Sequence, residues 1–151
     1  MYKRQIPEYA LERLEESGEE TMVRRQHAAY FLSLAEQAAA ELSGPRRTEW
    51  LNRLEDEHDN LRAALRWTKE HQEQTGLRLA VALSQFWELR GYLSEGARWL
   101  AELLAVVQNG VPELRAAALK FAGSRAFAFD FCSAAELTEQ SLALYLSLIH
   151  I

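Results

Sequence analysis

The chain has 151 residues, 48% of them hydrophobic, which is enough to bury a core in one domain or in a piece of a larger protein. Its 22 acidic residues outnumber the 17 basic ones, which argues against direct nucleic-acid binding, because contact with phosphates needs a concentrated basic patch. A single cysteine, Cys132, excludes an internal disulfide, and no apolar run reaches the ~18 residues of a membrane span. We therefore expect a cytoplasmic protein with no membrane partner, in which Cys132 is a buried structural residue rather than a catalytic thiol.

Apolar residues recur at intervals of three and four along almost the whole chain, and Gly and Pro separate the segments, which predicts an all-α fold. The expected helices are residues 6–16, 19–42, 48–71, 77–90, 94–107, 112–129 and 133–145. Thr48 and Ser94 are the expected N-caps, because a side-chain oxygen there accepts a hydrogen bond from a free backbone N–H. Gly91 supplies the permissive backbone at the break between two helices. On the 19–42 helix, the predicted core stripe is Met22, Ala29, Tyr30, Leu34 and Ala38.

Residues 50–67, WLNRLEDEHDNLRAALRW, surround His58 with carboxylates. The spacing alternates between three and four along one set of residues, which places His58 on an apolar helix stripe: Leu51, Leu54, His58, Leu61, Leu65 and Thr68. Glu55 and His58 make one Glu-x-x-His step, whereas di-iron bundles need two such steps and two further carboxylates. We expect a histidine of the core or of an interface; the alternatives are a metal ligand and a pH-responsive interface histidine.

No pattern of residues indicates catalysis. The seven glycines are isolated, so no phosphate-binding loop is formed, and no nucleotide-binding fingerprint is present. The carboxylates lie on predicted helix faces, where Arg53 with Glu57 and Asp59 with Arg62 are expected to form weak ion pairs. We therefore expect no enzyme, and no catalytic, cofactor-binding or metal-binding residues.

Two segments, residues 77–106 and 114–144, share the pattern helix, tight turn, helix. Each has a turn residue, an aromatic, a serine and a small residue in the same order: Gly91, Tyr92, Ser94 and Gly96 in the first, Asp130, Phe131, Ser133 and Ala135 in the second. This repetition resembles the tetratricopeptide repeat, a helical hairpin of about 34 residues that stacks into a superhelix. The second copy departs from it, since the step from Gly123 to Asp130 is one residue shorter than usual.

Four motifs in order carry a wider resemblance: EYALERLEESGE from Glu8, RRQHAAYFLSLAE from Arg24, the stretch from Trp50, and FWELRGYLSEGARWL from Phe86. Together they resemble large bacterial ATP-dependent transcriptional regulators of the signal-transduction ATPase class, often with a LuxR-type or other winged DNA-binding domain. The matching segment in that family follows the nucleotide-binding and winged-helix domains, where tetratricopeptide-like repeats begin. Its nucleotide-binding loop and DNA-reading helix have no counterpart in this chain.

The resemblance implies a division into three parts. Residues 1–18 are an N-terminal helix left from the preceding domain, residues 19–74 a long helical hairpin, and residues 75–151 two truncated tetratricopeptide-like hairpins. The stack is expected to be a short α-solenoid of antiparallel hairpins. Both ends, residues 1–5 and 146–151, look like translated sequencing adaptor, so the chain is expected to be a fragment.

The same resemblance implies that the repeats hold the ATPase closed or receive a signal. The repeat register then places Arg78, Val81, Gln85 and Glu88 on a concave groove, although each is equally compatible with an ordinary surface position. The expected function is a non-catalytic protein-interaction and regulatory segment, whose partner is the regulator's own ATPase domain or a signalling protein. A domain that senses a small-molecule effector is the alternative, and a helical enzyme is the third hypothesis.

Overall fold

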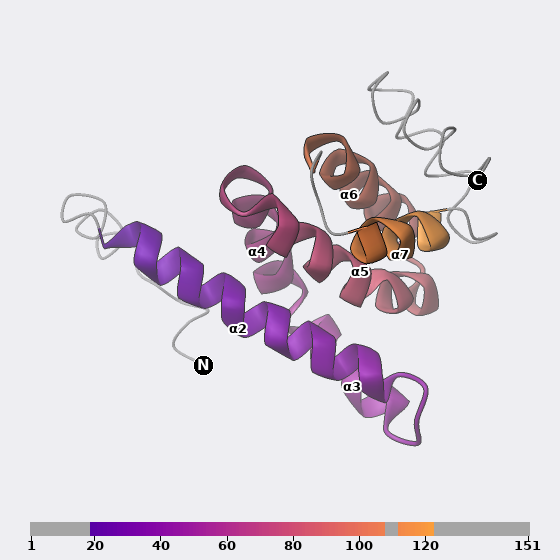
Figure 1. Ribbon diagram of the computed structural model, residues 1–151. Helices are drawn as coiled ribbons and strands as arrows, with labels where there is room; N and C mark the ends of the chain where they lie inside the picture. Colours follow the sequence, from indigo (N-terminus) through magenta and orange to yellow (C-terminus); the bar gives the residue numbers. More distant parts are fainter. Residues whose placement is uncertain (1–18, 108–111, 123–151) are drawn as a thin grey trace.

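The computed structural model describes residues 19–107 and 112–122, and these ranges hold six α-helices and no strand (Figure 1). The all-α prediction is confirmed for them. The helices are α2 (Glu20–Glu41), α3 (Arg47–Asp56), α4 (His58–His71), α5 (Glu73–Arg90), α6 (Leu93–Val106) and α7 (Pro112–Ala122). Outside the described residues lie the predicted helices 6–16 and 133–145, the end of helix 112–129, Cys132, and the segments 1–5 and 146–151. The domain boundaries stay predictions.

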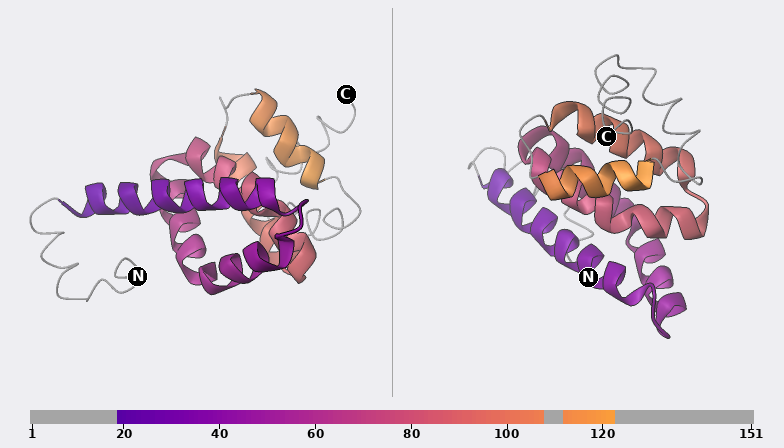
Figure 2. Two further views of the ribbon diagram at one scale, coloured as in Figure 1. Left: turned by 90° about the horizontal axis from the view of Figure 1, so that it is seen from below. Right: turned by 45° about the vertical axis from the view of Figure 1, so that its right-hand side comes forward.

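Helix α5 is the centre of the described part, because it packs against α2, α3, α4, α6 and α7. Leu77, Leu79, Leu83, Phe86 and Trp87 of α5 are all almost completely inaccessible to solvent. The long helix α2 lies along α4 and α5, while α7 packs on α5 and α6 (Figure 2). Burial of such apolar side chains is the main favourable contribution to folding, so α5 organises the core.

The prediction of one helix over residues 48–71 is wrong, because the chain bends at Glu57 into α3 and α4. The Glu57 backbone has φ −97° and ψ 9°, and its N–H donates to the carbonyls of both Arg53 and Leu54. The stripe predicted around His58 is nevertheless confirmed, since all six of its residues are buried. The spacing of apolar residues depends only on neighbouring positions in the chain, so the buried stripe continues across the bend. The bend lets both α3 and α4 face α5.

Both N-cap predictions are also wrong. Arg46 and Tyr92 occupy the N-cap positions of α3 and α6, and neither helix has a side-chain cap hydrogen bond. Thr48 and Ser94 are instead the second residues of those helices. The role of Gly91 is confirmed: its φ of 80° ends α5 in a left-handed conformation, and the N–H of Tyr92 donates to the Trp87 carbonyl at 2.8 Å.

Helix α5 begins at Glu73, earlier than the predicted start at Leu77. Only Gln72 separates it from the end of α4. This short connection brings Gly76 against α4 and α6. A Cβ atom on Gly76 would lie 2.9 Å from Thr68 Oγ1 and 2.9 Å from Leu103 Cδ2. The three helices therefore meet at a point that admits only a glycine without rearrangement.

The stripe predicted for α2 is partly wrong. Leu34 and Ala38 are buried, but Ala29 is exposed and Met22 is 63% exposed. The buried residues of α2 are Ala28, Phe31, Leu32, Leu34, Ala35 and Ala38. Met22, in the first turn of α2, lies on a face of that helix that stays open to solvent.

Candidate functional site

The predicted groove residues lie along one side of α5, at intervals of three and four. Arg78 and Glu88 are exposed, while Val81 and Gln85 are half-buried, and Val81 packs against the core. Exposed ends with a half-buried middle are compatible both with a groove and with an ordinary helix face. That they form a binding groove stays a prediction.

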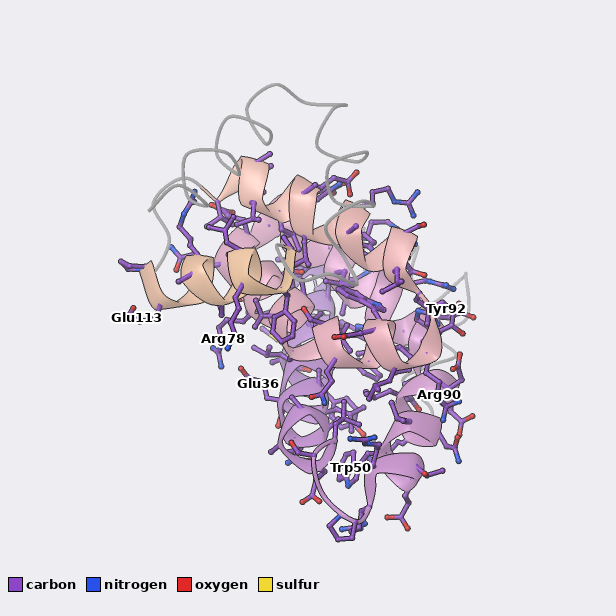
Figure 3. All side chains as sticks on the ribbon, turned by 90° about the vertical axis from the view of Figure 1, so that its right-hand side faces the viewer. Glu36, Trp50, Arg78, Arg90, Tyr92 and Glu113 are labelled. Carbon is purple, nitrogen blue, oxygen red and sulfur yellow. The ribbon has the colours of Figure 1, made fainter. Side chains whose placement is uncertain are left out.

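Arg78 makes a contact between helices that the sequence pattern did not predict. Its Nη2 atom donates to Glu36 Oε1 at 2.8 Å and to Oε2 at 2.9 Å, joining α5 to α2 (Figure 3). Both side chains are about half exposed, so solvent screening limits the pair to ~1 kcal/mol or less. They border a cavity of about 500 Å³ whose other lining residues all come from α2: Ala29, Leu32, Ser33 and Gln37.

A second cavity, the α2–α4 pocket, lies between the first turns of α2 and the second half of α4. It has a volume of about 350 Å³ and is lined by Glu20, Thr21, Arg24, Ala63, Arg66, Trp67, Glu70 and His71. The Trp67 and His71 rings stack, with centroids 4.7 Å apart and an interplanar angle of 13°. His71 Nδ1 is 3.0 Å from the Trp67 carbonyl oxygen; because a carbonyl only accepts, Nδ1 carries the hydrogen. An aromatic surface and charged side chains of both signs thus border one hollow.

His58 is buried, and its side chain lies between two carboxylates. Its Nδ1 atom is 3.8 Å from Glu55 Oε2, and Nε2 is 3.4 Å from Glu95 Oε2, a contact too long and too poorly aligned for a good hydrogen bond. The ring also contacts Phe86 edge-on and Tyr92 at centroid distances of 5.4 and 4.5 Å. The predicted burial of this histidine is confirmed.

We call His58, Glu55, Tyr92 and Glu95 together the His58 cluster. Two arginines balance the charges of its carboxylates. Arg62 donates to both oxygens of Glu95, from Nε at 2.9 Å and from Nη2 at 2.7 Å, and to Asp59 at 3.1 Å as predicted. Arg90 lies 3.6 Å from Glu55, and the Tyr92 hydroxyl donates to Glu55. Arg90 and Tyr92 lie on the same side of the molecule (Figure 3). The cluster joins α3 and α4 to the turn between α5 and α6.

These contacts shift three pKa values. The pKa of Arg62 rises, chiefly because of its hydrogen bonds to Glu95. Burial tends to raise the pKa of Glu95. The hydrogen bonds that Arg62 donates, together with the proximity of His58, outweigh burial, so the pKa of Glu95 is lowered. The hydrogen bond to Glu55 raises the pKa of Tyr92. The carboxylates of the His58 cluster therefore interact mainly with the neighbouring arginines and with Tyr92.

The described part of the chain has no group of three or more His, Cys, Asp or Glu side chains arranged to hold a metal ion.

Glu57, which was expected to pair with Arg53, is buried and accepts a hydrogen bond from Asn60 at 3.0 Å. Arg53 lies over the Trp50 ring, 5.3 Å from its centroid. Within residues 19–107 and 112–122, none of the helices combines the length and the apolar character that a bilayer crossing requires.

Sequence reasoning missed the α2–α4 pocket and the contribution of Glu95. The four-residue spacing of Trp67 and His71 was a usable signal, since residues at that spacing are neighbours on a helix. No sequence signal connects Glu95 to Arg62, because 33 residues separate them and only the packing of α4 on α6 brings them together.

Comparison with known proteins finds relatives among transcriptional regulators. Three curated mycobacterial proteins carry the name "Putative HTH-type transcriptional regulator": Mb0914c of Mycobacterium bovis, and MT0914 and Rv0890c of Mycobacterium tuberculosis strains. The chain is 38% identical to each over 103 residues, which is 66% of this chain. No protein-family model and no solved structure matches the sequence. The matched region spans only 11% of each relative, so the chain is similar to one helical segment of these regulators.

Proposed function

We propose that this chain is a non-catalytic regulatory segment of an HTH-type transcriptional regulator that acts in the cytoplasm. It offers a helical surface to a partner protein or to the regulator's own ATPase domain. The observation that carries the proposal is the 38% identity over 103 residues to the mycobacterial regulators. The sequence resemblance to signal-transduction ATPases supports the same assignment.

The packing of α5, α6 and α7 supports a tetratricopeptide-like stack. Gly91 makes the tight turn of the α5–α6 hairpin, and Gly96 is buried where a small residue is expected. Helix α7 packs on both helices of that hairpin, as the first helix of a following repeat does in an α-solenoid. In such a stack Arg78, Val81, Gln85 and Glu88 form the groove that receives the partner.

The His58 cluster favours a structural role over catalysis. Its two carboxylates are engaged by Arg62, Arg90 and Tyr92, and a general acid or base needs a group left open to a substrate. None of the cluster residues lines either cavity described above. The cluster therefore fits a structural role, in which it holds α3, α4 and α6 together.

A second candidate function, a sensor for a small-molecule effector, is favoured by the α2–α4 pocket. Its volume of about 350 Å³ falls at the lower end of the usual range of ligand pockets, ~300–1,000 Å³. One regulator can have both functions, protein interaction and effector sensing, when a ligand bound between α2 and α4 changes how a partner binds α5.

The regulatory role is tested with chimeras of Rv0890c in mycobacterial cells. The matching segment is either deleted or replaced by the corresponding residues of this chain, and the occupancy of DNA sites across the genome is measured. We expect deletion to change the occupancy and the replacement to restore it. The replacement carrying Arg78→Ala with Glu88→Lys should behave like the deletion.

Purified chain carrying the same two substitutions serves as the control for folding. Arg78 and Glu88 are exposed, and the Arg78–Glu36 pair contributes ~1 kcal/mol or less, so the unfolding temperature should stay within about 4 °C of the parent. A deletion that leaves occupancy unchanged contradicts a regulatory role. A double variant that matches the unsubstituted chimera contradicts the groove on α5.

A further inference from the structure

The α2–α4 pocket contains charges that the described part of the protein does not satisfy. Neither Arg66 nor Glu70 has a hydrogen-bond or ion-pair partner within residues 19–107 and 112–122, although both line the pocket. The other two charged residues, Arg24 and Glu20, approach each other at 3.7 Å. Both residues are exposed, so one guanidinium and one carboxylate at this cavity face solvent and are open to a ligand.

The charges of the pocket select the type of ligand. Two glutamates and two arginines line it, so their formal charges cancel. An anion would meet Arg66 but also the carboxylate of Glu70, and a cation would meet the reverse. A zwitterion satisfies both, because a guanidinium binds a carboxylate through two parallel hydrogen bonds and a carboxylate accepts from an ammonium group.

The spacing of Arg66 and Glu70 fits charges carried on one carbon atom. Residues four apart on a helix are neighbours, about 5–6 Å between Cβ atoms, so both long side chains reach one small molecule. Trp67 lies between them in sequence and is half-buried, and its ring stacks on His71. A planar side chain can pack on the accessible part of these rings. His71 Nε2, left as an acceptor when the ring is neutral, adds a polar contact.

We propose that the α2–α4 pocket binds an aromatic α-amino acid. Arg66 holds the carboxylate, Glu70 holds the ammonium group, and the Trp67–His71 stack packs against the aromatic side chain. The volume of about 350 Å³ suits a single amino acid rather than a peptide. The inference rests on the regulatory function proposed above and names the effector class of that function's sensor form.

The test uses the full chain and calorimetric titration with L-phenylalanine, L-tyrosine and L-tryptophan, followed by L-phenylalanine analogues that each lack one feature. The analogue 3-phenylpropionate lacks the ammonium group, phenethylamine lacks the carboxylate, and glycine lacks the ring. At least one aromatic amino acid should bind, and each analogue should bind at least about tenfold more weakly. No heat of binding up to about 10 mM ligand, or equal affinity for glycine, overturns the proposal.

Single-residue variants assign the two charge contacts. Arg66→Gln should weaken binding of the amino acid at least about tenfold without weakening that of phenethylamine, and Glu70→Gln should weaken binding of the amino acid as much without weakening that of 3-phenylpropionate. Arg25→Gln is the matched control, because Arg25 is exposed on α2 and does not line the pocket. Unchanged affinity in both pocket variants overturns the assignment. A negative titration together with a positive chimera result refutes the ligand site alone, whereas binding without any effect of the segment on DNA occupancy refutes the regulatory role alone.

Discussion

Gly76 provides a direct test of the packing at the junction of α4, α5 and α6. Replacing it with alanine adds a Cβ atom 2.9 Å from Thr68 Oγ1, 3.3 Å from Thr68 Cβ and 2.9 Å from Leu103 Cδ2. Real Cβ atoms do not tolerate 2.9 Å contacts, so neighbouring groups must move. Leu103 is completely buried, and Thr68 Oγ1 is held by its hydrogen bond to the Ala64 carbonyl at 2.7 Å.

The expected cost follows from two opposing effects. Overfilling a packed core costs ~1–3 kcal/mol, and rotating Thr68 away gives up a hydrogen bond worth ~1 kcal/mol within that range. Alanine recovers up to ~1 kcal/mol through its higher helix propensity. We therefore expect Gly76→Ala to lower the free energy of unfolding by about 1–2 kcal/mol, which corresponds to roughly 2–8 °C for a chain of this length.

Urea denaturation followed by circular dichroism measures this cost, and a double-mutant cycle identifies its origin. In a Thr68→Ala background the Oγ1 atom is absent, so the cost of Gly76→Ala should fall by about 1 kcal/mol. Gly44→Ala is the control, since its Cβ would meet only the Glu41 carbonyl at 3.6 Å, an ordinary contact. A Gly76→Ala protein as stable as the parent, or a cost that does not depend on Thr68, would refute the close approach of the three helices.

The remaining predictions concern a turn, an ion pair and the core. Gly91→Ala should cost about 1 kcal/mol through its φ of 80° alone, because no atom lies within 4 Å of the new Cβ; an unchanged urea midpoint would contradict this. Glu95→Gln should cost about 1 kcal/mol at about pH 7, a value reduced by solvent around the 36% exposed Arg62. Because the pKa of Glu95 is lowered in the folded state, this difference is present above its ordinary pKa of 4.5 and disappears as the pH falls through the folded value. Urea titrations between about pH 7 and pH 3 should show the two proteins converging, and a constant gap would exclude the ion pair as its source. Leu83→Ala should cost about 2–5 kcal/mol in thermal and urea unfolding, while Leu89→Ala, 41% exposed on the same helix, should stay within about 0.5 kcal/mol; similar costs at both sites would contradict the orientation of α5.

Local patterns predicted the burial of His58 but not its partners. The spacing of leucines around it was sufficient, because a side chain on an apolar helix stripe faces whatever that stripe packs against. Glu95 and Tyr92 lie 37 and 34 residues further along the chain, and they reach His58 only because α6 packs near α4. The helix caps failed for a related reason: Thr48 and Ser94 are suitable caps by residue type, but the turns preceding them place other residues at the cap positions.

The pocket residues show the same division. Trp67 and His71 were recognisable as helix neighbours, yet the cavity that they line together with Arg24 and Glu20 depends on how α2 crosses α4. The groove residues on α5 were chosen from a repeat register, and packing showed that Arg78 is joined to Glu36 on α2.

By itself, the sequence determined the all-helical class, the turn at Gly91 and the buried face of the two helices around His58, since these follow from the spacing of residues within one or two turns of a helix. The tertiary structure alone decided the bend at Glu57, the close approach at Gly76, the ion pair of Arg62 with Glu95, and the cavity between α2 and α4. Each of these depends on distances between segments far apart in the chain, which are set by how whole helices fill the core together and not by the residues of any one segment.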